Sequence, residues 1–298
     1  MIWLSRLSPG RQLAAFTHRF HDFGGKIPPA VVFSVAKDPM SRFGKLEFDL
    51  PEEQHAAGAS RSGSNHFLEE AQRLFFQADF EPALRSYARA VEYSPQSPQA
   101  WAGQVRALIE LEELREAGMW ADKALERFPQ NAELLASKAV IASRLGDHEG
   151  GLALSDASLE LQGDVPYLWI ARADVLLARR ESTASYCLTR AESLAPGDWS
   201  VYWLGGRVLL YWGKLATALR LAQKAVSLNA SELGGWMLAA ECQLQLGLIG
   251  PAEVSARQAV LLAPGNLAAT SLLQRTQRSG WMARLGGWWR STFRKGGE

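Results

Sequence analysis

The chain of 298 residues repeats one helical phrase at a spacing of 33 to 34 residues. Each copy has two small residues seven positions apart, and five positions later a terminal residue that is usually proline. The six copies are Ala83, Ala90 and Pro95; Ala117, Ala124 and Pro129; Gly151, Ser158 and Gly163; Ala184, Ala191 and Pro196; Ala218, Ala225 and Ala230; and Ala252, Ala259 and Pro264. This period predicts a stacked array of helix pairs, because a single pair cannot bury its apolar face alone.

The second copy, residues 98–131, shows how one unit is built. Pro98 opens the first helix, where its missing N–H has no cost. Large side chains then recur at helical spacing and are expected to face the partner helix, namely Trp101, Val105 and Leu108. The second helix carries small residues that let the two backbones approach closely: Ala117, Ala121 and Ala124.

This pattern resembles the tetratricopeptide repeat family, which has a large residue at the fourth place of each unit and small ones at the eighth, twentieth and twenty-seventh. The fourth place is filled by Phe67, Trp101, Leu135, Trp169, Tyr202 and Trp236. The resemblance covers residues 64–266 and implies an all-α, right-handed α-solenoid of about six helix pairs. Gly163 replaces the terminal proline in repeat three, which also has a glycine at its first small place, and the internal turn of repeat four is one residue short. We therefore expect these two repeats to pack less regularly.

The sequence outside the repeats divides into three segments. Residues 1–63 are not repeat-like and end in a linker composition over 56–63. An apolar stripe of Leu13, Phe16, Phe20 and Phe23 makes this segment either a cap on the first repeat or an interaction arm. Residues 267–279 are expected to form a capping helix over the open end of the array. Residues 280–298 form a basic, aromatic and amphipathic tail.

The family resemblance implies that the first helix of each unit lines an inner, concave groove. The residues assigned to a partner-binding groove are Arg106, Arg144, Tyr167, Asp174, Trp203, Arg207, Tyr211, Met237 and Glu241, beside Gln72, Phe75, Ile109, Val140 and Ile170. Trp203, Arg207 and Tyr211 follow one another at a spacing of four and combine the residue types that dominate interface energetics. The alternative is that Trp203 packs within the solenoid. Leu68 and Gln72 stand where some co-chaperones carry a carboxylate clamp, so a chaperone-tail adaptor is not expected.

Composition and motifs argue against several other classes of protein. The net charge is +1, and residues 267–298 hold six basic residues against one acid. A neutral body with a basic tail argues against nucleic acid as the main partner. Cys187 and Cys242 form no CxxC pair and are expected to be buried, reduced thiols. The sequence indicates no catalytic set, metal site or cofactor, and it has neither a long apolar stretch nor a secretory signal, so we expect a non-catalytic, cytoplasmic protein.

The tail has the pattern of a helix that lies in a membrane interface. Wound as a helix, residues 281–295 place Trp281, Met282, Leu285, Trp288, Trp289 and Phe293 within an arc of about 140°. Arg284, Arg290, Arg294 and Lys295 lie outside that arc. This arrangement predicts peripheral attachment to a membrane, with anionic lipid favoured. The alternative is that the tail docks its tryptophans on the final repeats.

These features together indicate a non-catalytic scaffold or adaptor that links a protein partner, a filament or a multiprotein assembly to a membrane surface. Kinesin light chains use such repeats to join cytoskeletal machinery to cargo, and a light-chain-like linker would fit this layout. The alternatives are an assembly factor or chaperone for a membrane-associated complex, a repeat domain that serves a separate enzyme, and a soluble scaffold whose C-terminal helix caps the solenoid.

Overall fold

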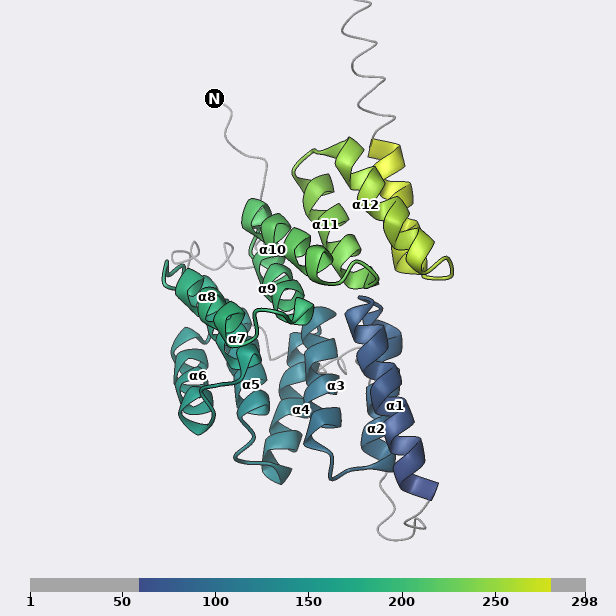
Figure 1. Ribbon diagram of the computed structural model, residues 1–298. Coiled ribbons are helices and arrows are strands. Elements are labelled where there is room, and N and C mark those ends of the chain that lie inside the picture. The colour runs from purple at the N-terminus through teal and green to yellow at the C-terminus, as the bar shows by residue number, and fades with distance from the viewer. Residues whose placement is uncertain (1–58, 280–298) are drawn as a thin grey trace, which may run out of the picture. The chain divides into compact units, whose positions relative to one another are not determined.

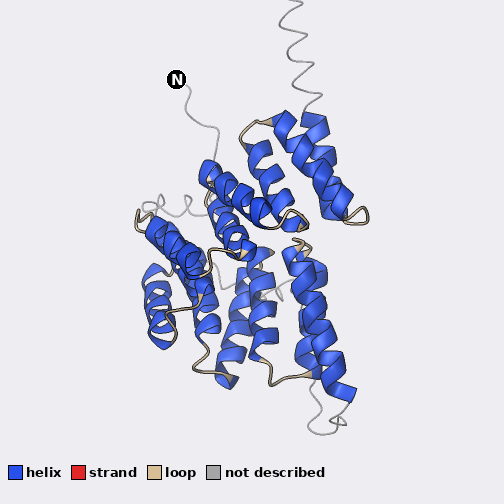
Figure 2. Ribbon diagram, viewed as in Figure 1, coloured by secondary structure: helices blue, strands red, loops and turns tan. Residues whose placement is uncertain are grey.

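The computed structural model describes residues 59–279, and over this range the backbone consists of helices joined by short turns, without a strand (Figures 1 and 2). A helix over residues 267–279 follows the last of six helix pairs. The paired helices are α1 (Ala59–Phe76) with α2 (Phe80–Tyr93), α3 (Pro98–Glu110) with α4 (Leu114–Arg127), α5 (Ala132–Leu145) with α6 (His148–Leu161), α7 (Pro166–Ala178) with α8 (Ala184–Leu194), α9 (Trp199–Tyr211) with α10 (Leu215–Leu228), and α11 (Leu233–Gln245) with α12 (Ile249–Leu262).

The helix pairs stack in the order of the sequence. The two helices of each pair pack on one another. Each odd-numbered helix from α1 to α9 also contacts the next odd-numbered helix, and the contact between α1 and α3 is the smallest of these. The odd-numbered helices therefore form one inner layer, while the even-numbered helices cover it. The predicted all-helical repeat array is confirmed.

The turn inside every described pair is closed in the same way. One residue has a left-handed backbone conformation, at intervals of 33 or 34 residues: Ala78, Glu112, Gly146, Arg180, Gly213 and Gly247. The next backbone N–H donates to the carbonyl five residues earlier, as Asp79 does to Leu74 and Leu248 does to Gln243. This hydrogen bond satisfies a carbonyl at the end of the first helix. The three non-glycine residues each accept a conformational cost of about 1–2 kcal/mol.

In four of the six repeats, an aromatic residue at the fourth place hydrogen-bonds to the end of the preceding repeat. The indole N–H of Trp101 donates to the carbonyl of Pro95 at 3.0 Å, and that of Trp169 donates to Gly163 at 2.8 Å. Tyr202 and Trp236 make the equivalent bonds, each to a carbonyl six residues earlier. A large side chain with a polar tip fills the fourth place in these four repeats, and Gly163 serves as acceptor as well as proline does.

Repeat three packs more tightly than its two glycine substitutions suggested. A Cβ atom at Gly151 of α6 would lie 2.0 Å from Ser143 Oγ and 2.9 Å from the backbone oxygen of Ala139, both on α5. Glycine at this small place therefore permits a closer approach of the two helices rather than a looser one. The shortened turn in repeat four precedes α8, which has 11 residues.

The first end of the described range differs from the sequence-based expectation, whereas the last end agrees with it. Helix α1 begins at Ala59, so the segment with linker composition, residues 56–63, overlaps its first turns. Extending an existing helix adds one hydrogen bond for each residue fixed, which offsets the weak helix preference of serine and glycine there. At the other end, Ala269 and Leu272 of the helix over 267–279 are buried beside Ala256 and Ala259, the place expected of a capping helix. The expectations for residues 1–58 lie outside the described residues.

Both cysteines are free and buried, as predicted. Burial raises the pKa of Cys242 to about 12, with the neighbouring Glu241 adding to that shift. The thiol therefore stays protonated and unreactive near neutral pH.

We expect two glycine-to-alanine substitutions to have opposite effects on stability. Gly151→Ala should lower the free energy of unfolding by about 1–3 kcal/mol, because its Cβ would push α6 away from α5. Gly118→Ala, in α4, meets nothing closer than 3.7 Å and should raise that free energy by about 0.5–1 kcal/mol through helix propensity. Chemical denaturation of both variants measures the difference, and equal gains in stability would contradict the close packing of repeat three.

Candidate partner-binding surface

The nine residues assigned to the groove all lie on the inner layer, in α3, α5, α7, α9 and α11. All nine thus lie on the first helix of a pair, and their role in binding a partner stays a prediction. Many of these side chains contact each other across the inner face. The contacts form three clusters of polar and aromatic side chains.

The first cluster centres on a buried ion pair between Arg144 of α5 and Asp174 of α7. Arg144 Nε donates to Asp174 Oδ1 at 3.2 Å and Nη2 donates to Oδ2 at 2.5 Å, and the side chains are 4% and 1% exposed. The indole N–H of Trp212 also donates to Asp174 Oδ1 at 2.9 Å. Tyr211 covers the guanidinium at 3.7 Å from its ring centre. Burial raises the pKa of Asp174, and Arg144 and Trp212 oppose that shift by stabilising the carboxylate.

The second cluster surrounds Arg106 of α3. Its guanidinium lies 4.8 Å from the ring centre of Tyr167 and 3.7 Å from a carboxylate oxygen of Glu133. The hydroxyls of Tyr167 and Ser137 are 2.9 Å apart. Because Ser137 already donates its hydrogen to the carbonyl of Glu133, Tyr167 is the donor. Burial raises the pKa of Tyr167 to about 12, so this hydroxyl keeps its hydrogen at neutral pH.

The third cluster joins residues that are 97 positions apart. Arg207 of α9 forms an ion pair with Glu110 of α3, in which Arg207 Nε donates to Glu110 Oε2 at 2.9 Å. The same guanidinium lies 4.9 Å from the ring centre of Phe80. Repeats two and five are therefore in direct contact across the inner face. A small cavity of about 30 Å³ remains between α1, α3, α5, α7 and α9.

Trp203 is fully buried, with 0% of its surface exposed. Its ring packs against three phenylalanines of repeat one, with ring centres 5.7 Å away for Phe75, 5.5 Å for Phe76 and 6.5 Å for Phe80. Trp203 therefore packs within the solenoid, as the alternative interpretation of the sequence has it. Figure 1 shows the end of the α1–α2 pair beside the start of α11.

Two hollows remain on the inner side. The larger has a volume of about 570 Å³ and includes Glu112, Leu210, Tyr211 and Gln245 in its lining. The smaller has a volume of about 220 Å³ and includes Phe80, Trp203, Met237 and Leu272. Arg207 and Glu241 line both, so the two hollows adjoin each other. Both hollows are open places on the described inner face that could hold another molecule.

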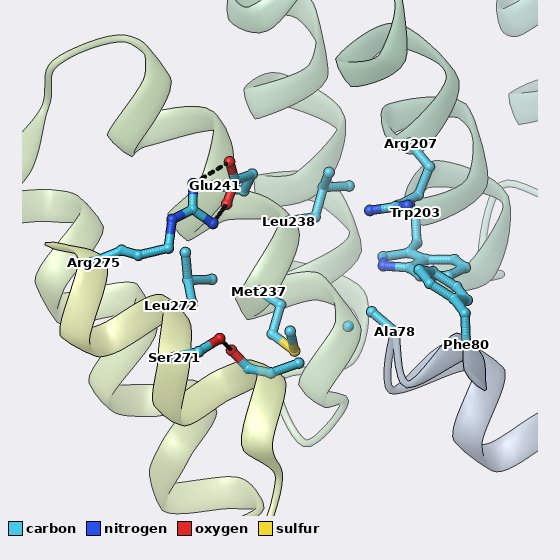
Figure 3. A pocket seen from close by; sticks show the side chains of 12 residues that line it. Ala78, Phe80, Trp203, Arg207, Met237, Leu238, Glu241, Ser271, Leu272 and Arg275 are labelled. Atoms are coloured by element: carbon cyan, nitrogen blue, oxygen red, sulfur yellow. Dashed lines mark hydrogen bonds and ion pairs between the residues drawn. The ribbon is translucent and has the colours of Figure 1, made fainter. Parts of the chain in front are cut away.

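The closing helix supplies one wall of the smaller hollow. Figure 3 shows Trp203 and Phe80 on one side and Leu272 and Arg275 on the other. Arg275 makes a two-point ion pair with Glu241, with nitrogen–oxygen distances of 2.9 and 3.0 Å. Arg275, Glu110 and Phe80 are not among the residues predicted for the groove. Phe80 is the first residue of α2 and Arg275 lies outside the repeats, so neither lies on the first helix of a repeat. Glu110 does lie on such a helix, α3, which is the signal that could have found it.

Within residues 59–279, no group of three or more histidine, cysteine, aspartate or glutamate side chains is placed to hold a metal ion. Over the same residues, no helix has the length and apolar character needed to cross a bilayer. The residues assigned to membrane binding lie outside the described residues, so their role stays a prediction: Trp281, Met282, Arg284, Leu285, Trp288, Trp289, Arg290, Phe293, Arg294 and Lys295.

No family model and no curated protein matches the sequence. Among solved structures, the chain is similar to the APC/C hetero-tetramer Cut9-Hcn1, with 16% identity, a TM-score of 0.42, and coverage of 72% of this chain and 42% of that chain. It is similar to a tetratricopeptide repeat protein from Parabacteroides merdae ATCC 43184, with 18% identity, a TM-score of 0.46, and coverage of 72% and 84%. It is also similar to YrrB, a tetratricopeptide protein with an unusual peptide-binding site, with 18% identity, a TM-score of 0.36, and coverage of 62% and 96%. The chain thus spans less than half the length of the first of these.

Removing the charge of Asp174 should destabilise the array strongly. Asp174→Asn keeps an oxygen for Trp212 but leaves Arg144 buried without a counter-charge, and we expect a loss of about 3–5 kcal/mol in the free energy of unfolding. The double variant Arg144→Met/Asp174→Asn removes the unpaired charge and should recover part of that loss. Urea denaturation of both variants provides the measurement. A double variant less stable than Asp174→Asn would show that the charge pair is not the cause.

Proposed function

We propose that this protein is a non-catalytic scaffold that binds an extended segment of a partner protein on the inner side of its helical array. The observation that carries the proposal is the pair of adjoining hollows that share Arg207 and Glu241. The larger one falls within the size range of ligand sites. Its wall includes Tyr211, which is 39% exposed and belongs to a residue type enriched in binding hot spots.

The charges around the hollows indicate what kind of segment would fit. Arg144, Arg207 and Glu241 each have an ion-pair partner within the chain. Glu112, at the rim of the larger hollow, is exposed. A segment that places a basic side chain near Glu112 and apolar or aromatic side chains against Tyr211 and Leu210 would be complementary to this surface.

Replacing Tyr211 tests the proposed surface. Partners are captured with the wild-type protein and identified by mass spectrometry, and the affinity of the main partner is then measured. Tyr211→Ala should weaken that affinity by about 1–3 kcal/mol, the usual effect of losing an interface anchor. Arg207→Ala is a less specific test than the sequence suggested, because it also removes the contact with Glu110.

Tyr186 of α8 offers a matched control for this experiment. It is 65% exposed and lies outside both hollows, so Tyr186→Ala should leave the affinity unchanged. Equal effects of the two substitutions, or no effect of either, would place the partner elsewhere on the protein.

We further propose that the tail attaches this scaffold to a membrane, so that the protein acts as an adaptor. The support is the sequence pattern of residues 281–295, in which aromatic side chains share one helical face and basic ones lie on the other. The described helix over 267–279 leads directly into this segment. The partner captured in the previous experiment would decide between a filament and a multiprotein assembly.

Vesicle flotation tests the membrane half of the proposal. The intact protein should float with anionic vesicles at low salt, and a truncation after residue 279 should not. Trp288→Ala/Trp289→Ala should reduce binding to neutral and anionic vesicles alike, since it removes the apolar contact. Replacing Arg290, Arg294 and Lys295 with glutamine should reduce only the salt-sensitive binding to anionic vesicles, because exposed charges are screened over about 10 Å. An intact protein that stays unbound would favour the alternative in which the tail docks on the array.

A further inference from the structure

The turn between α1 and α2 is seated on helices of the fifth and sixth repeats. Phe76, at the end of α1, lies with its ring centre 5.3 Å from that of Trp199 and 5.5 Å from that of Trp203. Ala78, the left-handed residue of the turn, packs against the cluster that contains Leu233 and Met237. Side chains from the first repeat therefore occupy a surface that α9 and α11 build.

Gly234 shows that α11 is fitted to this turn. A Cβ atom at Gly234 would lie 2.1 Å from the backbone oxygen of Phe76 and 2.8 Å from Trp203 Nε1. Gly234 is the second residue of α11, and its backbone has no positive φ angle that would itself require glycine. The close approach of the Phe76 backbone accounts for the glycine at this position.

The turn leaves one polar group of this surface unused. The indole nitrogen of Trp203 is buried, and it has no hydrogen-bond partner in the described structure. Trp203 also lines the smaller hollow (Figure 3). Its indole nitrogen lies near Gly234. A buried donor without an acceptor carries a free-energy penalty that a ligand with a suitably placed carbonyl oxygen would remove. The turn thus fills the apolar part of this surface but leaves the indole N–H of Trp203 without a hydrogen-bond acceptor.

We infer that the α1–α2 turn is a built-in occupant of a peptide-binding site on α9 and α11, and that a partner segment with closely spaced aromatic residues binds there by displacing it. The chemistry of the partner follows from that of the occupant, which presents Phe75, Phe76 and Phe80 to Trp199 and Trp203. This inference rests on the proposed function for the existence of a partner, but the docking of the turn can be tested without one.

Tethering explains why the site would be closed in the free protein. A segment linked to its site has a high effective concentration, so even a modest fit keeps the site occupied. A competing segment then binds with an affinity reduced by the small fraction of molecules in which the turn is undocked. The Arg207–Glu110 ion pair, which also lies against Phe80, holds the turn and the inner face together.

A peptide made of residues 72–83 of this chain is the probe for the emptied site. Phe76→Ala/Phe80→Ala removes the contacts that these two rings make with Trp199 and Trp203, keeps the contact of Phe75, and leaves α9 and α11 unaltered in sequence. By fluorescence anisotropy, the labelled peptide should bind this variant at least tenfold more tightly than the wild-type protein. Adding Gly234→Ala should abolish that binding, because its Cβ would occupy the place of the Phe76 carbonyl. A folded Phe76→Ala/Phe80→Ala variant that does not bind the peptide would overturn the inference.

Hydrogen exchange on single glycine variants keeps the inference testable if the double variant fails to fold. Gly234→Ala should increase exchange over residues 76–80 and over the first turn of α9. Gly250→Ala is the matched control, since Gly250 is also the second residue of a helix and its Cβ would meet nothing within 4 Å. Unchanged exchange over 76–80 in Gly234→Ala would show that the turn is not held there.

The two proposals fail in different ways. If the peptide binds the emptied site but Tyr211→Ala leaves the captured partner unaffected, the built-in occupant stands and the larger hollow is not the partner surface. If Tyr211→Ala weakens the partner but neither the peptide nor hydrogen exchange responds as expected, the partner surface stands and the turn is a fixed structural contact.

Discussion

The burial of Trp203 beneath the α1–α2 turn determines much of what the inner face of this protein can do. Three phenylalanines of the first repeat surround an indole of the fifth, and Gly234 removes the side chain that would keep the two apart. Burying large aromatic side chains contributes several kcal/mol in apolar area and edge-to-face contacts. The same contact brings Arg207 to Glu110, so the aromatic packing and the ion pair stabilise one arrangement.

These long-range contacts change how the array is stabilised. In an ordinary repeat array each unit contacts its neighbours alone, so the stability is close to a sum of local terms. Here repeat five also contacts repeats one and two, at sequence separations of 97 residues or more. A change in the first repeat can therefore affect the surface of the fifth without passing through the repeats between them, which couples the closed inner face to the hollows beside it.

The buried polar clusters contribute more to selecting one arrangement of the helices than to the free energy of unfolding. Removing Arg144 and Asp174 from water has a large free-energy cost, which the pair and Trp212 offset only because every partner is well placed. A helix shifted along its neighbour would leave one of these charges unpaired. The clusters thus favour one register of α5, α7 and α9, and that register shapes the hollows proposed to receive a partner.

The sequence by itself determined the fold class. The repeat of small residues and of a large fourth-place residue reports contacts between neighbouring helices, which are local, so the period identifies six helix pairs. The assignment of a groove to the first helix of each pair came from the family resemblance and not from the period. Three of the six left-handed turn positions hold glycine, at 146, 213 and 247, but the other three hold Ala78, Glu112 and Arg180, so no glycine pattern marks these turns in the sequence. Only the tertiary structure decided that the inner face is largely filled by its own side chains. The small rotation from each repeat to the next is set by many packing contacts, and its accumulated effect decides whether Glu110 meets Arg207 and whether Phe76 reaches Gly234. No spacing in the sequence encodes a contact between repeats that are not neighbours.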